Sequence, residues 1–395
     1  MKHAGLHPWD LSPAEAIRLQ RELARHIVRR GSLPARGVRA VAGCDVAFDT
    51  PHGRAVGAVV VLEWPSLAVV ERVAVEAPVT FPYVPGLLSF RETPVLLEAF
   101  ERVRTPVDLL MVDGHGYAHP RRFGYACHLG LLLDIPALGV AKSRLIGTHA
   151  TVGPRRGDRA DLLDGGEVVG GLLRTRERVR PLYVSVGHKI ALAAAERWAL
   201  ACARAYRMPE PTRLADRLSR EAKARMLALT LEMVVEQRAG ERGRWEWIPG
   251  EQRAVFRHDL DPMPLHYGCS ADIINPADGE LLDVMLLDPR PYERGERVVV
   301  RIIDVLRRRD GDDKLLALPV DRSSPPPRTI AHARRAAFAW YAAHGKPVTR
   351  WGGEEDALAC IEQTRAAPSP SAQSSPRTKR VHRRRAVAAG SPGSM

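Results

Sequence analysis

The stretch that most constrains the fold is Asp108-Leu-Leu-Met-Val-Asp113-Gly-His115-Gly, where a short apolar run ends in a carboxylate and a loop of glycine and histidine. Such a run, bounded by turn residues, predicts a buried strand that delivers Asp113 to the edge of a sheet. The two glycines let the backbone approach a ligand closely. A solvated surface loop is the alternative for this motif alone, and the remaining chain has to decide.

Length and composition predict a soluble protein with two domains. A chain of 395 residues exceeds one ordinary hydrophobic core. No apolar run is long enough to span a bilayer, and the N-terminus has no signal-peptide core. The 5 cysteines are scattered and lack Cys-x-x-Cys spacing, which argues against a disulfide framework and a zinc site. We therefore expect a cytoplasmic protein with reduced thiols and no membrane partner.

The charge balance favours a polyanionic partner. The formal net charge is +13, and excess Lys and Arg commonly neutralise phosphates. Residues 366–395 are rich in Pro, Ser and Ala and contain six basic residues and no acid, which predicts a disordered basic tail. The tail either strengthens DNA binding or is a solvated end.

The order of apolar patterns predicts an α/β domain with a mixed sheet that starts antiparallel. Ser12-Pro13-Ala14-Glu15 has the residues of a helix N-terminus, and the helix is expected to end at Gly31. Three β-like runs follow at residues 38–48, 55–63 and 68–75, and then helical and strand-like segments alternate up to about residue 206.

Four ionisable side chains lie within or at the ends of these elements, namely Asp45, Glu92, Asp113 and His188. Asp45 stands among apolar neighbours, where an ionised carboxylate needs a partner such as a metal. Carboxylates from several elements, with a histidine and no cysteine, suit Mg²⁺ better than zinc. Mg²⁺ beside a basic surface favours phosphodiester hydrolysis.

Residues from about 8 to 225 resemble endonuclease V, a repair nuclease of the ribonuclease H-like superfamily that incises beside deoxyinosine. The resemblance rests on six ordered blocks: Ala42-Gly-Cys-Asp-Val-Ala47, Pro82-Tyr-Val-Pro-Gly-Leu-Leu-Ser-Phe-Arg-Glu92, Val112-Asp-Gly-His-Gly116, His119-Pro-Arg121, Gly139-Val-Ala-Lys142 and Val184-Ser-Val-Gly-His-Lys189. It implies a ribonuclease H-like fold for a domain at residues 1–226.

The resemblance also implies roles for single residues. Asp45 and Asp113 match Mg²⁺ ligands, with Mn²⁺ as the alternative ion, and Glu92 and His188 are expected to complete the catalytic set. Tyr83 matches a wedge at the lesion, and its alternative is a core tyrosine in a proline turn. His119 and Lys142 are expected to contact DNA or to tune the site.

The chain beyond residue 227 contains two acidic turns separated by β-like sequence. Asp278-Gly-Glu280-Leu-Leu-Asp283 enters one apolar run, and Asp310-Gly-Asp312-Asp-Lys314 enters another. Two such turns make a site for several Mg²⁺ ions, whereas solvated turns are the alternative.

Residues 227–365 look like a family I inorganic pyrophosphatase, an enzyme built on an oligonucleotide-binding-type β-barrel. The resemblance implies that Asp278, Asp283, Asp310 and Asp312 bind metal and that Glu280 holds the attacking water. The residues expected to bind pyrophosphate are Arg244, Arg257, Tyr267, Lys314 and Tyr341, and Glu232 and Glu246 are expected to add acidic groups.

Two departures from the pyrophosphatase pattern leave alternatives open. Glu280 stands where the family has aspartate, and Ala342 stands where it has a phosphate-binding lysine. A misplacement of about 1 Å can cost on the order of 10²-fold in rate. The chain is therefore expected to nick deoxyinosine-containing DNA and to hydrolyse pyrophosphate. The alternative is an endonuclease V whose second domain is weak or inactive and serves binding or homo-oligomerisation.

Overall fold

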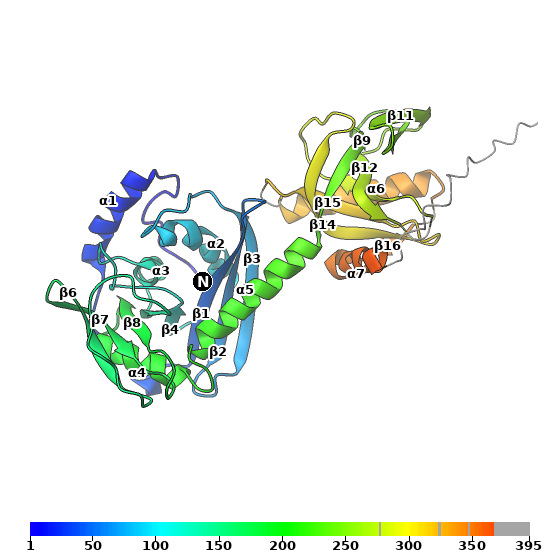
Figure 1. Ribbon diagram of the computed structural model, residues 1–395. Coiled ribbons are helices and arrows are strands. Elements are labelled where there is room, and N and C mark those ends of the chain that lie inside the picture. Colours follow the sequence, from blue (N-terminus) through cyan, green and yellow to red (C-terminus); the bar gives the residue numbers. More distant parts are fainter. Residues whose placement is uncertain (276–277, 323–324, 347, 367–395) are drawn as a thin grey trace, which may run out of the picture.

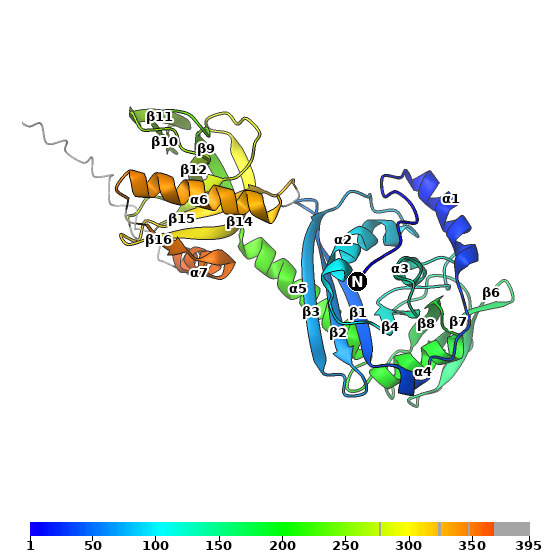
Figure 2. The same cartoon turned by 180° about the vertical axis from the view of Figure 1, so that it is seen from behind.

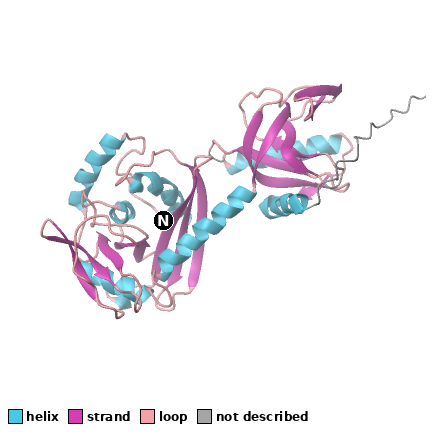
Figure 3. Ribbon diagram, in the orientation of Figure 1, coloured by secondary structure: helices cyan, strands magenta, loops and turns pink. Residues whose placement is uncertain are grey.

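The computed structural model describes residues 1–275, 278–322, 325–346 and 348–366. Two units follow one another along the chain (Figure 1), and helices are prominent around the sheet of the first unit, whereas strands dominate the second (Figure 3). Apart from Ala366, the predicted basic tail lies outside the described residues. None of the helices described is long and apolar enough to cross a membrane.

The first unit is built on one 8-stranded sheet with the order β3-β2-β1-β4-β5-β8-β7-β6. β1 pairs in parallel with β4, and β4 with β5, whereas the other neighbours are antiparallel. This confirms the predicted mixed sheet with an antiparallel start. The strands are β1 (Ala40–Asp49), β2 (Arg54–Glu63), β3 (Val69–Pro78), β4 (Leu109–Val112), β5 (Ala137–Ala141), β6 (Arg159–Asp164), β7 (Glu167–Leu173) and β8 (Leu182–His188).

Helices cover both faces of this sheet because the buried strands are apolar on both sides. β4 shows this directly, since Leu110 and Val112 belong to one core with α2 and α3, while Leu109 and Met111 belong to another with α4. The helices are α1 (Pro13–Leu23), α2 (Leu88–Arg102), α3 (Tyr125–Leu133), α4 (Leu192–Cys202) and α5 (Glu210–Ala228), with short 3₁₀ turns at Ala24–His26 and Ala35–Gly37.

The first helix begins as predicted but ends earlier. Ser12 and Glu15 form the expected reciprocal capping box. The α-helix stops at Leu23, and a 3₁₀ turn follows to His26. The predicted end at Gly31 is therefore wrong, because Ile27 is extended and the Val28 N–H donates to the His188 ring instead of continuing the helix.

The second unit contains a closed barrel. The sheet order is β15-β13-β12-β9-β14-β16, and pairing of β15 with β14 closes five of these strands on themselves. This confirms the predicted mainly-β barrel. The strands are β9 (Thr230–Gln237), β10 (Arg244–Ile248), β11 (Arg253–His258), β12 (His266–Ile274), β13 (Leu281–Leu286), β14 (Arg297–Arg308), β15 (Lys314–Pro319) and β16 (Val348–Trp351); β10 and β11 form a separate ribbon.

Two helices pack on the barrel through separate cores. Helix α6 (Pro327–Ala343) buries Ala333, Ala337 and Tyr341, and Figure 2 shows it crossing the strands. Helix α7 (Gly353–Ala366) contributes Ala357 and Ile361 to the other core.

Helix α5 links the two units, since it packs on β1 and β2 and ends directly before β9 (Figure 1). Buried charges add contacts between the units. The Arg54 guanidinium donates to the Val320 carbonyl, and Arg301 forms a 3.0 Å ion pair with Glu76.

Candidate active sites

Asp45 and Asp113 lie at the same level on neighbouring strands. Cys44 of β1 is the register partner of Val112 of β4, so in this parallel pair the next residues are Asp45 and Asp113. A Cβ atom on Gly43 would stand 2.1 Å from the backbone of Pro211 in α5. Glycine at this position therefore allows α5 to lie close against β1, next to Asp45.

Helix α5 supplies two side chains that are not among the residues predicted from the sequence. Ser219 Oγ donates a 2.6 Å hydrogen bond to Asp45 Oδ2. Asp216 lies one turn earlier on the helix, and its charge acts on both Asp45 and Asp113. Their spacing of three residues places both side chains on one helix face. A helix predicted over this segment of the sequence would have indicated that the two residues lie together.

The carboxylates of this site have raised pKa values. Burial raises the pKa of Asp45 to about 6, and the charges of Asp113 and Asp216 add to the rise. Burial likewise raises the pKa of Glu92, in α2, to about 8, with Asp45 and Asp113 contributing. The pKa of Asp113 is also raised by burial, although Lys142 Nζ lies 2.5 Å from its Oδ2.

His188 does not join this group, and its predicted place in the catalytic set is wrong. It pairs with Ala137 of β5, which pairs in turn with Leu110 of β4. His188 is thus three residues below Asp113 and two strands away, or about 10 Å along and about 10 Å across the sheet. Its ring instead accepts a 3.3 Å hydrogen bond from the Val28 N–H and faces Asp134 at 3.7 Å.

A pocket of about 360 Å³ lies beside the carboxylates, with Gly114, Tyr125 and Tyr83 in its lining. Tyr83 is 72% exposed, which excludes the alternative of a core tyrosine. His119 also lines the pocket and is buried, with Nε2 3.1 Å from the Gly86 carbonyl. Burial, followed by the Arg121 charge, lowers the pKa of His119 to about 4, so a neutral ring supports the Tyr83 loop.

Charge decides whether this first site fits a divalent cation. Among the described residues, no group of three or more His, Cys, Asp or Glu side chains is gathered closely enough to enclose a metal ion. However, burial mainly, and repulsion between neighbouring carboxylates in addition, raise the pKa values of Asp45, Glu92 and Asp113, so ionisation of all three needs compensating positive charge. A hard cation with oxygen ligands supplies that charge, so this set of donors fits Mg²⁺.

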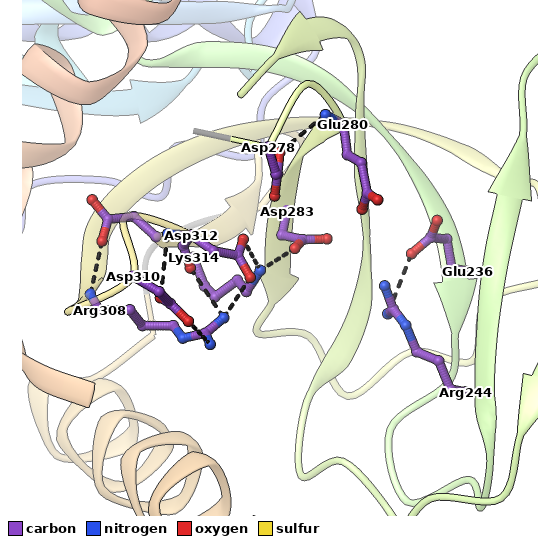
Figure 4. Close-up of polar contacts among 10 residues, drawn as sticks. Glu236, Arg244, Asp278, Glu280, Asp283, Arg308, Asp310, Asp312 and Lys314 are labelled. Atoms are coloured by element: carbon purple, nitrogen blue, oxygen red, sulfur yellow. Dashed lines mark hydrogen bonds and ion pairs between the residues drawn. The ribbon is translucent and has the colours of Figure 1, made fainter. Parts of the chain in front are cut away.

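The second site is a pocket of about 190 Å³ on the barrel. Seven of the predicted residues, from segments far apart in the sequence, line it: Arg244, Tyr267, Glu280, Asp283, Asp312, Lys314 and Tyr341. Figure 4 labels five of them, Arg244, Glu280, Asp283, Asp312 and Lys314. Arg244 lies over the Tyr267 ring at 4.6 Å. Asp278 and Asp310 stand on the two acidic turns, where Asp278 accepts a 2.9 Å hydrogen bond from the Glu280 N–H.

Basic side chains already pair with the acids of this pocket. Lys314 is buried and its ammonium contacts both Asp283 and Asp312. Arg308, which is not among the predicted residues, contacts Asp312 and lies 2.5 Å from Asp310 (Figure 4). The predicted arrangement of several metal ions on Asp278, Asp283, Asp310 and Asp312 therefore does not fit, because fixed cations occupy the positions facing three of these carboxylates.

Three other predicted residues lie elsewhere. Glu232 forms a 2.6 Å ion pair with Arg297, and both side chains are more than one third exposed. Glu246 and Arg257 form an ion pair with each other across the β10–β11 ribbon and are outside the pocket lining. The acid that meets Arg244 is Glu236, at 3.6 Å (Figure 4), and burial raises its pKa to about 7.

Comparisons with known structures found similarities for both parts of the chain. Over 35% of this chain, the structure is similar to an inorganic pyrophosphatase from Neisseria gonorrhoeae, with 24% identity, 91% of that chain covered and a TM-score of 0.30. A crystal structure of endonuclease V from Streptomyces avermitilis is 43% identical, with 55% of this chain and 95% of that chain covered and a TM-score of 0.52.

The family assignment comes from the sequence of the first unit. The family model for endonuclease V matches residues 21–217. Endonuclease V of Gloeobacter violaceus is 51% identical over 217 residues, which are 54% of this chain and 87% of that protein. With this identity over most of a relative's length, the chain belongs to the endonuclease V family.

Proposed function

We propose that the first unit is a Mg²⁺-dependent endonuclease that nicks DNA beside deoxyinosine, with Mn²⁺ as the alternative ion. The observation that carries the proposal is the group of half-buried carboxylates, Asp45, Glu92, Asp113 and Asp216, next to a pocket beside the exposed Tyr83. An acidic site of this kind attracts a cation, and the pocket provides a place for a displaced base.

The residues of the chain have separable tasks in this reaction. Asp45, Asp113 and Asp216 are the residues that would hold the cation, and Glu92 would accept a proton or orient water. A divalent cation bound there stabilises charge on the scissile phosphate and lowers the pKa of bound water. Ser219 fixes the orientation of Asp45 through its hydrogen bond. Lys142 contacts Asp113 while its side chain is half exposed, so its ammonium is within reach of a DNA phosphate.

Recognition of the lesion is assigned to the loop of Tyr83. The exposed ring stacks in the space left by the displaced base, since aromatic rings stack on bases of any sequence. The base itself enters the pocket next to Gly114, whose lack of a side chain leaves room beside Tyr125. His119 and Arg121 both contact the Gly86 carbonyl and hold the loop in place.

The test is nicking of a duplex that contains one deoxyinosine, with and without Mg²⁺. Asp45→Ala and Asp113→Ala are expected to abolish nicking, and a duplex with deoxyguanosine at the same position serves as the control. Nicking by both variants at the parental rate would contradict the site assignment.

A second candidate function is hydrolysis of pyrophosphate to two phosphates by the barrel. Convergence of Arg244, Lys314, Tyr267 and Tyr341 with Glu280 on one pocket favours it. The alternative is a barrel that binds its ligand without hydrolysis. Release of phosphate above that of a Glu280→Ala variant supports hydrolysis, and equal release by the two proteins favours the binding-only alternative.

A further inference from the structure

Arg308 is a buried cation inside the barrel pocket. It ends strand β14, its side chain is 4% exposed, and its guanidinium faces Asp310 and Asp312 (Figure 4). Its Nε atom is buried and lacks a hydrogen-bond partner among the described residues. Because a buried guanidinium carries five donors in a fixed fork, this one retains capacity for a further acceptor.

Several basic side chains face the pocket, and three of them are held in place by carboxylates: Arg308 by Asp310 and Asp312, Lys314 by Asp283 and Asp312, and Arg244 by Glu236. The pocket lining contains four basic side chains, Arg244, Arg308, Lys314 and Lys346, and three carboxylates, Glu280, Asp283 and Asp312. Lys314 is buried between Asp283 and Asp312, so it screens those two carboxylates from an incoming anion. Arg244 is held against the Tyr267 ring and faces the same pocket.

We infer that this pocket binds a diphosphate group directly through Arg308, Lys314 and Arg244, without divalent cations. In a multi-metal phosphate site, metal ions lie between the carboxylates and the anion, whereas here the side-chain cations occupy that position. The ligand is free pyrophosphate or the diphosphate group of a nucleotide. This inference rests on the proposed role of the barrel in recognising diphosphate, but not on hydrolysis.

Calorimetric titration of the full chain with pyrophosphate in EDTA tests the inference. Binding is expected in EDTA, and Arg308→Met is expected to weaken it at least about tenfold, since one charge-assisted contact pair is lost. Arg308→Lys keeps the charge and is expected to retain more affinity than the Met variant. Arg297→Met is the matched control, because Arg297 lies on the same strand but is exposed and paired with Glu232.

The outcomes separate this inference from hydrolysis. Binding only after Mg²⁺ is restored overturns metal-independent recognition, while phosphate release in Mg²⁺ would still support the hydrolytic proposal. Titration with ADP beside pyrophosphate shows which source of diphosphate binds more tightly, and preference for either one supports the inference. Equal affinity for orthophosphate would overturn it, because the pocket would then be a general anion site. Each variant should nick deoxyinosine-containing DNA at the parental rate and give the parental circular dichroism spectrum, which verifies that it is folded.

Discussion

The Ser219 hydroxyl donates a 2.6 Å hydrogen bond to Asp45, 174 positions earlier in the chain. The two residues come from α5 and β1, and α5 also leads directly into the barrel. One helix therefore both completes the carboxylate site and connects the two units. Because its Ser219 hydroxyl holds one oxygen of Asp45, this helix also sets the direction in which that carboxylate faces.

Loss of the Ser219 hydroxyl is expected to slow nicking. A hydrogen bond to a charged group contributes about 1.5–3 kcal/mol, so Ser219→Ala should lower the single-turnover nicking rate by about tenfold or more. Ser66→Ala is the control, because Ser66 makes an equivalent hydroxyl–carboxylate contact with Glu63 in an exposed turn far from Asp45. Parental rates in Ser219→Ala would show that the orientation of Asp45 does not limit the reaction.

The structure and the sequence prediction differ in the residue that accompanies Asp45 and Asp113: it is Asp216 in the structure and His188 in the prediction. Asp216→Ala is expected to reduce Mg²⁺-dependent nicking by at least about 100-fold if the carboxylate holds the ion, whereas His188→Gln should stay within a few-fold of the parent. The His188 variant is expected to lower the melting temperature instead, since it loses the hydrogen bond from Val28. The opposite ranking of the two nicking rates would restore His188 to the site.

The reason for this difference lies in strand register. The short motif around Asp113 predicts a strand end, and the motif around Asp45 predicts a neighbouring strand, so local pattern and family resemblance together located both carboxylates. His188 also follows a strand-like run, but β8 is antiparallel to β5 and its last residue therefore lies at the opposite end of the sheet. The direction of a strand is a tertiary property that its own residues do not specify.

In the barrel too, the sequence alone does not determine which side chains meet. Glu232 and Glu236 lie four residues apart on β9, and both are acids on a β-like run, so the sequence alone did not distinguish them. The backbone N–H of Trp247 donates to Glu236, which fixes that acid beside Arg244, and Glu232 instead meets Arg297 of the neighbouring strand β14. Arg308 stands in a run of three arginines, and such charge runs are typical of a solvated surface, so the sequence does not single it out.

The exposed ring of Tyr83 makes a prediction that separates recognition from stability. Tyr83→Ala is expected to weaken nicking of deoxyinosine-containing duplex by about tenfold or more, since aromatic stacking on a base contributes about 1–3 kcal/mol. The melting temperature should stay near that of the parent, because the side chain is 72% exposed. Tyr206→Ala is a control of similar exposure, at 51%. Nicking by Tyr83→Ala at the parental rate would remove the ring from lesion recognition.

The raised pKa of Glu92 predicts how stability depends on pH when cations are removed. Its folded-state pKa is about 8, against a usual value of 4.5, mainly because of burial. The folded protein therefore binds a proton that the unfolded chain releases above about pH 4.5, so the Glu92 contribution lowers the free energy of unfolding progressively as pH rises toward about 8. Glu92→Gln is neutral at every pH, so this substitution removes the loss of stability that ionisation of Glu92 causes.

Thermal unfolding in EDTA at pH 5 and pH 8 measures the effect. Glu92→Gln is expected to raise the melting temperature at pH 8 by a few degrees, at about 2–4 °C per kcal/mol for a unit of this size, and to change it little at pH 5. Glu101→Gln, at the exposed end of the same helix, should show no comparable difference between the two pH values. Mg²⁺ is expected to reduce the gap between parent and Glu92→Gln at pH 8, because a bound cation stabilises the ionised carboxylates of the parent. A gap of equal size at both pH values would instead mean that the substitution acts through packing in α2, and not through the charge of Glu92.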